Sequence, residues 1–211
     1  MRELSIEVTQ QARCGGRAVG AMFFAFFGGV WALLGYDLGG WRTPLLLILP
    51  ATVALILLLA AVRVVRKSRG AMIAVRGRTE YGRMRRQFRA INAGQWIVAI
   101  MAVCVLHHFG LDEWSAPTIM LIVGLHMLPL ARVFQYPPHY LTGAALIVTA
   151  IVYPLASRSG PASALGCMLA AMILWLSAAW SLRQQPQLRP MRPVARSSSS
   201  RAPAGHRAPH R

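Results

Sequence analysis

The chain has 211 residues, 55% of them hydrophobic, and a formal net charge of +17. The two properties are segregated, because long uncharged apolar runs alternate with short arginine-rich ones. Such segregation excludes an ordinary soluble domain and is typical of a chain that crosses a bilayer several times. Three scattered cysteines exclude a disulfide framework. We therefore expect an all-α fold, a polytopic transmembrane helix bundle.

The first apolar run follows a short polar segment, residues 1–17, which we expect to be cytoplasmic. No clean small-residue cleavage site follows the run, so we expect it to be a retained span rather than a secretory signal. A helix needs about 20 apolar residues to cross a hydrocarbon core about 30 Å thick. Six runs within residues 18–182 meet this requirement: 18–36, 44–65, 95–111, 115–134, 139–156 and 161–182.

The segment between the second and third runs, residues 66–94, is rich in arginine. Apolar side chains recur in it at helical spacing with arginines between them, which predicts a basic amphipathic helix that lies in the membrane interface and leads into the third run. We interpret it as a topology determinant in contact with lipid, and a docking site for an acidic protein or a lipid headgroup is the alternative. Nucleic acid is an unlikely partner, because no recognition motif accompanies the charge. The arginines expected to contact anionic phospholipids are Arg83, Arg85, Arg86 and Arg89.

The distribution of arginine also predicts the orientation. The N-terminal segment, residues 66–94 and the C-terminal tail hold most of the basic residues, whereas the opposite loops hold Arg42 and Arg158. The positive-inside rule then places both termini in the cytoplasm, as six spans require. Residues 183–211 contain five prolines, a serine run and no apolar stretch, which predicts a disordered basic tail.

The fourth run contains the polar group of greatest interest. His126 lies eleven residues beyond Ser115, about 16 Å along a helix and so near the middle of the bilayer. A ring at that depth is expected to face the bundle interior and to bond a serine, threonine, tyrosine or backbone carbonyl. Pro129 frees the carbonyl of Leu125 and predicts a kink beside the ring. Arg132, near the cytoplasmic end of the run, completes this candidate intramembrane polar site.

His126 admits three interpretations. It is a structural histidine bonded across helices, a group that binds a solute or transfers protons, or a ligand of a metal or haem. Haem is disfavoured because His107 and His108 lie near the outer end of the third run, far from His126 in depth.

The same run holds a short motif made of Gly124, Leu125, His126, Pro129, Leu130, Ala131 and Phe134. In these residues it resembles a segment found in an uncharacterised group of small multi-pass bacterial membrane proteins. The resemblance covers about a tenth of the chain. It implies a bacterial cytoplasmic (inner) membrane origin and carries no activity.

A second polar group lies between the third and fourth runs. It comprises His107, His108, Asp112 and Glu113, which we expect at the extracytoplasmic end. Histidines beside carboxylates can bind a divalent metal or relay protons, although a solvated hairpin turn accounts for them equally simply.

These features predict a membrane protein with an accessory, scaffolding or regulatory role and no cofactor. A transporter of a small solute or of protons, with a pocket near His126, is the alternative. A lipid-modifying enzyme is less favoured, because the chain has no Walker loop, GxSxG, HExxH or paired intramembrane carboxylates. Besides lipid, we expect a membrane-protein partner or a homodimer.

Overall fold

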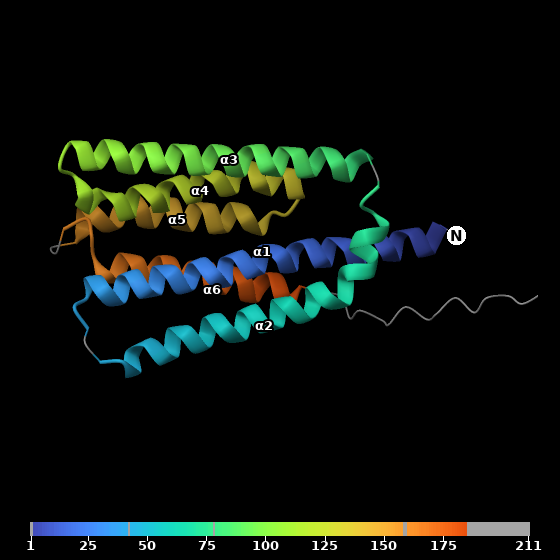
Figure 1. Cartoon of the computed structure of the whole chain (residues 1–211), viewed down its shortest axis with the longest axis horizontal. Coiled ribbons are helices and arrows are strands. Elements are labelled where there is room, and N and C mark those ends of the chain that lie inside the picture. The colour runs from blue at the N-terminus through green and yellow to red at the C-terminus, as the bar shows by residue number, and fades with distance from the viewer. Residues whose placement is uncertain (1, 42, 78, 158–159, 185–211) are drawn as a thin grey trace, which may run out of the picture.

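The computed structural model describes residues 2–41, 43–77, 79–157 and 160–184, and this part of the chain is helical apart from short connections (Figure 1). Each helix runs antiparallel to the one before it, so successive helices begin at opposite ends of the bundle. Their bounds are α1 Arg2–Leu38, α2 Leu45–Ala74, α3 Thr79–His108, the 3₁₀ turn η1 Asp112–Trp114, α4 Ser115–Phe134, α5 Pro138–Ala156 and α6 Ala164–Arg183.

Six helices are long and apolar enough to cross a membrane, which confirms the predicted number of spans. The fourth run coincides with α4, and the fifth and sixth differ from α5 and α6 by a few residues. The first three helices are longer than their apolar runs. Residues 1–17 were expected to be a separate segment, but α1 is one helix from Arg2 onward. The expected disorder of the tail concerns residues 185–211, which lie outside the described residues.

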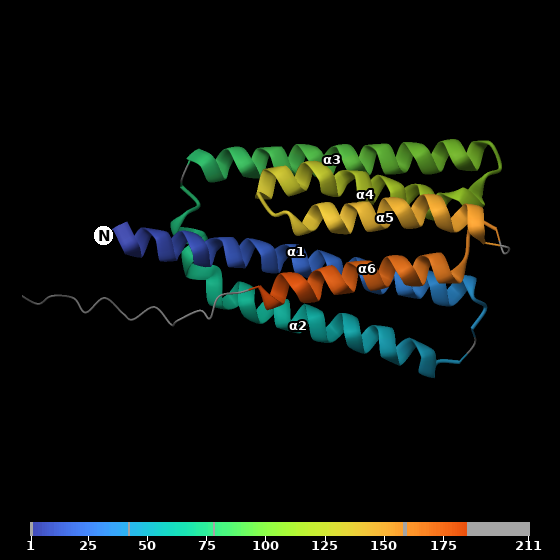
Figure 2. The ribbon, with the colours of Figure 1, turned by 180° about the vertical axis from the view of Figure 1, so that it is seen from behind.

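The helices pack as two groups of three. In one group α1 packs against α2 and α6, and in the other α4 packs against α3 and α5. The groups meet chiefly where α6 packs against α5. The helix α6 lies behind α1 in Figure 1 and in front of it in Figure 2, whereas α2 and α3 lie at opposite edges in both views. Because α2 and α3 each have one main neighbour, most of their apolar surface is left for lipid.

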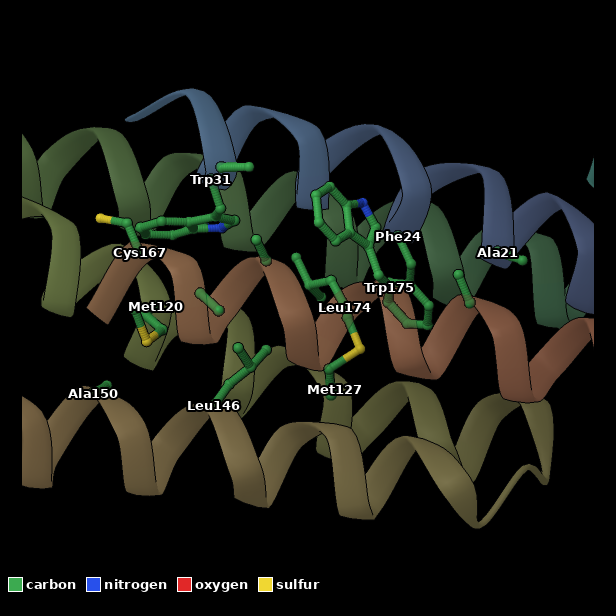
Figure 3. Packing of buried hydrophobic residues seen from close by; sticks show 14 of the residues in the cluster. Ala21, Phe24, Trp31, Met120, Met127, Leu146, Ala150, Cys167, Leu174 and Trp175 are labelled. Carbon is green, nitrogen blue, oxygen red and sulfur yellow. The ribbon is translucent and has the colours of Figure 1, made fainter. Parts of the chain in front are cut away.

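The core lies along α6. Trp175 and Leu174 of α6 lie between Phe24 of α1 and the side chains of α4 and α5, as Figure 3 shows. The indole of Trp175 donates a 3.2 Å hydrogen bond to the carbonyl oxygen of Ala25. A Cβ on Gly28 would lie 2.5 Å from this ring, so glycine there gives the indole its space. The large ring of Trp175 and the absence of a side chain at Gly28 together let α6 pack closely against α1.

Glycines also bring α4 and α5 together. A Cβ on Gly143 would lie 2.7 Å from the carbonyl oxygen of Gly124, and a Cβ on Gly124 would lie 2.9 Å from that of Gly143. The two backbones therefore touch directly, as is common where small residues let membrane helices approach.

The six helices differ in length in a consistent way. The helices α4, α5 and α6 have 20, 19 and 20 residues, about 30 Å each, which matches the hydrocarbon core. The helices α1, α2 and α3 have 37, 30 and 30 residues, about 55 Å for the first and about 45 Å for the others. All three exceed the core thickness by more than a moderate tilt would absorb.

The excess lies at one end, where Figure 1 shows α1, α2 and α3 passing the ends of the shorter helices. Tyr136, in the turn between α4 and α5, contacts Arg17 of α1 and Ser181 of α6, so Arg17 marks the level at which the short helices end. On α2, Lys67 is bonded through its carbonyl to Gln11, so it lies beyond this level. On α3, Phe88 contacts Phe134, the last residue of α4. Residues 2–16, 67–74 and 79–87, which we call the basic extension, therefore project past the bundle.

The basic segment is divided between two helices, because α2 continues to Ala74 and α3 begins at Thr79. The predicted amphipathic helix is the first part of α3, continuous with its membrane-spanning part. The reason is local: arginine is a good helix former, so a helix does not stop where its side chains become charged.

Candidate functional site

The most elaborate arrangement of polar and aromatic side chains surrounds Tyr136, between α4 and α5. Tyr136 is buried, and its hydroxyl donates to Gln184 Oε1 at 3.2 Å and lies 3.5 Å from Ser181 Oγ. The guanidinium carbon of Arg17 lies 4.9 Å from the centroid of the Tyr136 ring, a cation–π contact. One side chain in a turn therefore contacts the first and the last helix.

His139, one residue into α5, lies in an aromatic surrounding. Its ring meets those of Phe24, Phe134 and Tyr136 edge to face, at centroid separations of 5.6, 6.4 and 4.9 Å. These contacts come from α1, from α4 and from the turn, so His139 helps to close the bundle at the level of Arg17. We call Arg17, Phe24, Phe134, Tyr136 and His139 the junction cluster.

His126 lies on α4, half-buried and within electrostatic range of His139. The structure records no hydrogen bond from its ring to any described residue. The expected serine, threonine, tyrosine or carbonyl partner is therefore not found in this part of the chain. Pro129 lies inside α4 and is exposed, and Arg132 lies exposed in its last turn.

A separate pair of hydroxyl groups lies between α5 and α6. Thr142 Oγ1 and Ser177 Oγ are 2.8 Å apart, and each hydroxyl also bonds a carbonyl one turn earlier in its own helix. Such pairs satisfy polar groups inside a membrane bundle and hold helices together. We interpret this pair as structural.

At the opposite end of the bundle the structure brings together two of the four predicted polar residues. His107 Nδ1 and Asp112 Oδ1 lie 2.8 Å apart, with both side chains largely exposed. His108 packs instead against Phe109, and Glu113 lies near the backbone of Gly160. Among the described residues no group of three or more His, Cys, Asp or Glu side chains is placed to hold a metal ion.

The four arginines predicted to contact lipid lie on the first part of α3, and all are exposed. Three of them belong to the basic extension. Its other basic side chains, also exposed, come from α1 and α2. None of these basic side chains has an acidic partner among the residues that the structure describes. The set comprises Arg13, Lys67, Arg69, Arg83, Arg85 and Arg86.

A crevice of about 10 Å³, the size of about one water molecule, lies elsewhere, at the ends of α4, α5 and α6 opposite the basic extension. Met120, Thr149, Tyr153 and Cys167 are among its lining residues. It does not include His126, so it is no extension of the predicted pocket.

Sequence reasoning missed the junction cluster almost entirely. Residues 135–138 fall between two predicted spans, and His139 was predicted to begin the second of them. The sequence does contain one indication of it. Tyr136 and His139 flank two consecutive prolines, which restrict the backbone of this short connection. Arg17 gave no signal of its own among so many arginines.

The chain matches no known family model, no curated protein and no solved structure.

Proposed function

We propose that this protein is an accessory or scaffolding protein of the bacterial inner membrane, which binds an acidic partner through its basic extension. The observation that carries the proposal is the projection of α1, α2 and α3 beyond the level at which the other helices end. The projecting parts carry six exposed cations with no acidic partner among the described residues. Such a surface attracts and orients an acidic protein.

The packing of the extension supports a docking role. Gln11 Nε2 donates to the carbonyl of Lys67 at 3.2 Å, and a Cβ on Gly15 would lie 2.5 Å from Met72 Sδ. The projecting parts of α1 and α2 are therefore held against each other. Charges on packed helices lose less conformational entropy on binding than charges on a free loop.

The charge balance supports a cytoplasmic position for the extension. The opposite end carries Asp37, Asp112 and Glu113, and few arginines. By the positive-inside rule the end with the basic extension faces the cytoplasm, with both termini on that side.

Site-specific photo-crosslinking in intact cells tests the proposal. A photoreactive residue at Arg86 should give a discrete crosslinked protein, and the same probe at Ile97, exposed on the membrane-spanning part of α3, should not. Neutralising Arg83 and Arg85 to glutamine should weaken the Arg86 product, and added salt should weaken it further. Equal products from Arg86 and Ile97, or a product insensitive to the substitutions, would contradict the proposal.

A second candidate function rests on the two histidines. His126 and His139 lie in electrostatic range between α4 and α5, and protic side chains continue from His139 through Tyr136 to Gln184. This arrangement favours proton-linked transport as the alternative. Reconstituted vesicles with a pH-sensitive dye inside would show proton uptake that His126→Gln and His139→Gln abolish. Uptake that is absent in the unaltered protein would remove this candidate.

A further inference from the structure

The helix α3 lies at the edge of the bundle in Figure 1 and in Figure 2, and one of its faces has no partner along its whole length. The exposed residues of this face change with depth. Arg86 belongs to the basic extension, whereas Ile97 and Met101, deeper in the membrane, present large apolar side chains. Between these two parts lie three exposed small residues, which we call the small patch: Ala90, Ala93 and Gly94.

The small patch is about one helical turn tall and lies just inside the hydrocarbon boundary. Its residues are three and four positions apart, so they share one face of α3, and Arg86 lies on that face one turn nearer the basic extension. Phe88 contacts Phe134, the last residue of α4, and so marks the level at which the short helices end. At about 1.5 Å per residue, Ala90 and Gly94 lie about 3 Å and about 9 Å below that level. An amphipathic helix in the membrane interface buries its apolar face to a similar depth, roughly 5–10 Å.

Glycines in the membrane-spanning parts of this protein mark contacts between helices at most of their positions. At six of them an added Cβ would lie within 3.4 Å of another helix, as is common where small residues let membrane helices approach. These six are Gly28, Gly29, Gly35, Gly124, Gly143 and Gly166. An added Cβ on Gly20 or Gly94 would meet no heavy atom within 4 Å, but Gly20 has Phe23 and Phe24 one turn deeper, whereas Gly94 adjoins two alanines. Gly94 therefore has the surroundings of a helix contact without a second helix among the described residues.

Two occupants fit the small patch poorly. Two copies of this chain in one membrane share their orientation, so a symmetric contact there would bring Arg86 of one copy near Arg86 of the other, and like charges weaken an interface. A membrane-spanning helix aligned with α3 would also have to pack on the large side chains of Ile97 and Met101. A helix that crosses α3 needs only one turn of small side chains.

We propose that the small patch binds an acidic amphipathic helix of the partner, which lies in the membrane interface and crosses α3. The apolar face of this helix packs on the small patch, and its carboxylates meet Arg83 and Arg86, which are exposed and have no acidic partner among the described residues. A helix is about 10 Å across, which matches the rise of about 12 Å along α3 from Arg86 to Gly94. The inference rests on the proposed function, because it names the part of the acidic partner that binds.

Photo-crosslinking of the full chain in intact cells tests the depth of the contact. A photoreactive residue at Ala93 should capture the same protein as one at Arg86, and one at Ile97, a turn deeper on the same face, should capture none. A product at Arg86 without one at Ala93 would overturn this inference and leave the proposed function standing. Equal products at Ala93 and Ile97 would indicate a membrane-spanning helix and would also overturn it. Absence of any product at Arg86 would contradict the proposed function and this inference together.

A matched pair of glycine variants tests the close approach of the partner helix. Gly94→Leu places a large side chain in the small patch and should lower the yield of the Arg86 product about tenfold. Gly20→Leu, at the corresponding end of α1 and with equally open surroundings, should leave that yield unchanged. Both variants should keep the melting temperature of the unaltered protein, because neither new side chain meets a neighbouring atom at its Cβ. An undiminished Arg86 product in Gly94→Leu would overturn the proposal, and if that variant does not fold, the comparison of Ala93 with Ile97 decides.

Discussion

The guanidinium of Arg17 lies against the ring of Tyr136, 4.9 Å from its centroid, and so ties the first helix to the turn between the fourth and fifth. Neither α4 nor α5 has a Cα within 8 Å of one in α1 among the described helical residues. The contacts of this turn therefore join α1 directly to the pair α4 and α5, which have no close backbone packing against α1.

Two substitutions of Tyr136 should separate its ring from its hydroxyl. Tyr136→Phe keeps a ring for Arg17 and removes the hydrogen bond to Gln184, so it should cost about 0.5–1.5 kcal/mol of unfolding free energy. Tyr136→Leu removes the ring as well and should cost more. Unfolding by sodium dodecyl sulfate in mixed micelles measures both, and equal losses would show that the ring contributes nothing.

The two histidines should differ in their effect on stability. His139→Ala removes edge-to-face contacts with three rings, each contributing about 0.5–1.5 kcal/mol, and should destabilise the protein clearly. His126→Leu removes a ring for which no hydrogen bond is recorded, and should cost about 0.6 kcal/mol or less. The same mixed-micelle titration ranks them, and a larger loss at His126 would indicate that its ring has a structural partner.

Replacing Gly28 by any residue with a side chain should destabilise the protein. Gly28→Ala places a methyl group 2.5 Å from the Trp175 ring, so we expect a loss of about 1–3 kcal/mol from overpacking. Gly16→Ala, on the same helix but with open surroundings, is the matched control and should be neutral or stabilising. The fluorescence of the chain's tryptophans is expected to shift in Gly28→Ala alone, and a stable Gly28→Ala protein would contradict the packing of α1 against α6.

The orientation is open to a direct test. Reporter fusions after Arg89 and Gln185 should read cytoplasmic, and fusions after Gly40, Glu113 and Ser159 should read extracytoplasmic. The reason is that the helices alternate in direction and the arginines gather at one end. An external reading after Arg89 would reverse the assignment, because residues 66–94 hold much of the charge on which it depends.

The sequence by itself determined the number of spans and, for α4, both bounds. A span of lipid-facing helix is a local property, because each backbone polar group must be bonded within the segment and the apolar run must match the hydrocarbon core. The predicted apolar runs cover only part of α1, α2 and α3. Hydropathy indicates where the chain passes from lipid to water. The helix itself continues into water as long as its residues have a high helix propensity.

Only the tertiary structure decided which polar groups meet. His126 was evident from its depth, whereas the contact of His139 with Phe24 joins residues 115 positions apart in the sequence. Arg17 and Tyr136 likewise come together because α6 lies between α1 and α5. Apolar periodicity does not specify which helices are neighbours in a bundle. That choice depends on close fits between particular surfaces, such as Gly28 with Trp175 and Gly124 with Gly143, which become visible once the helices are in place.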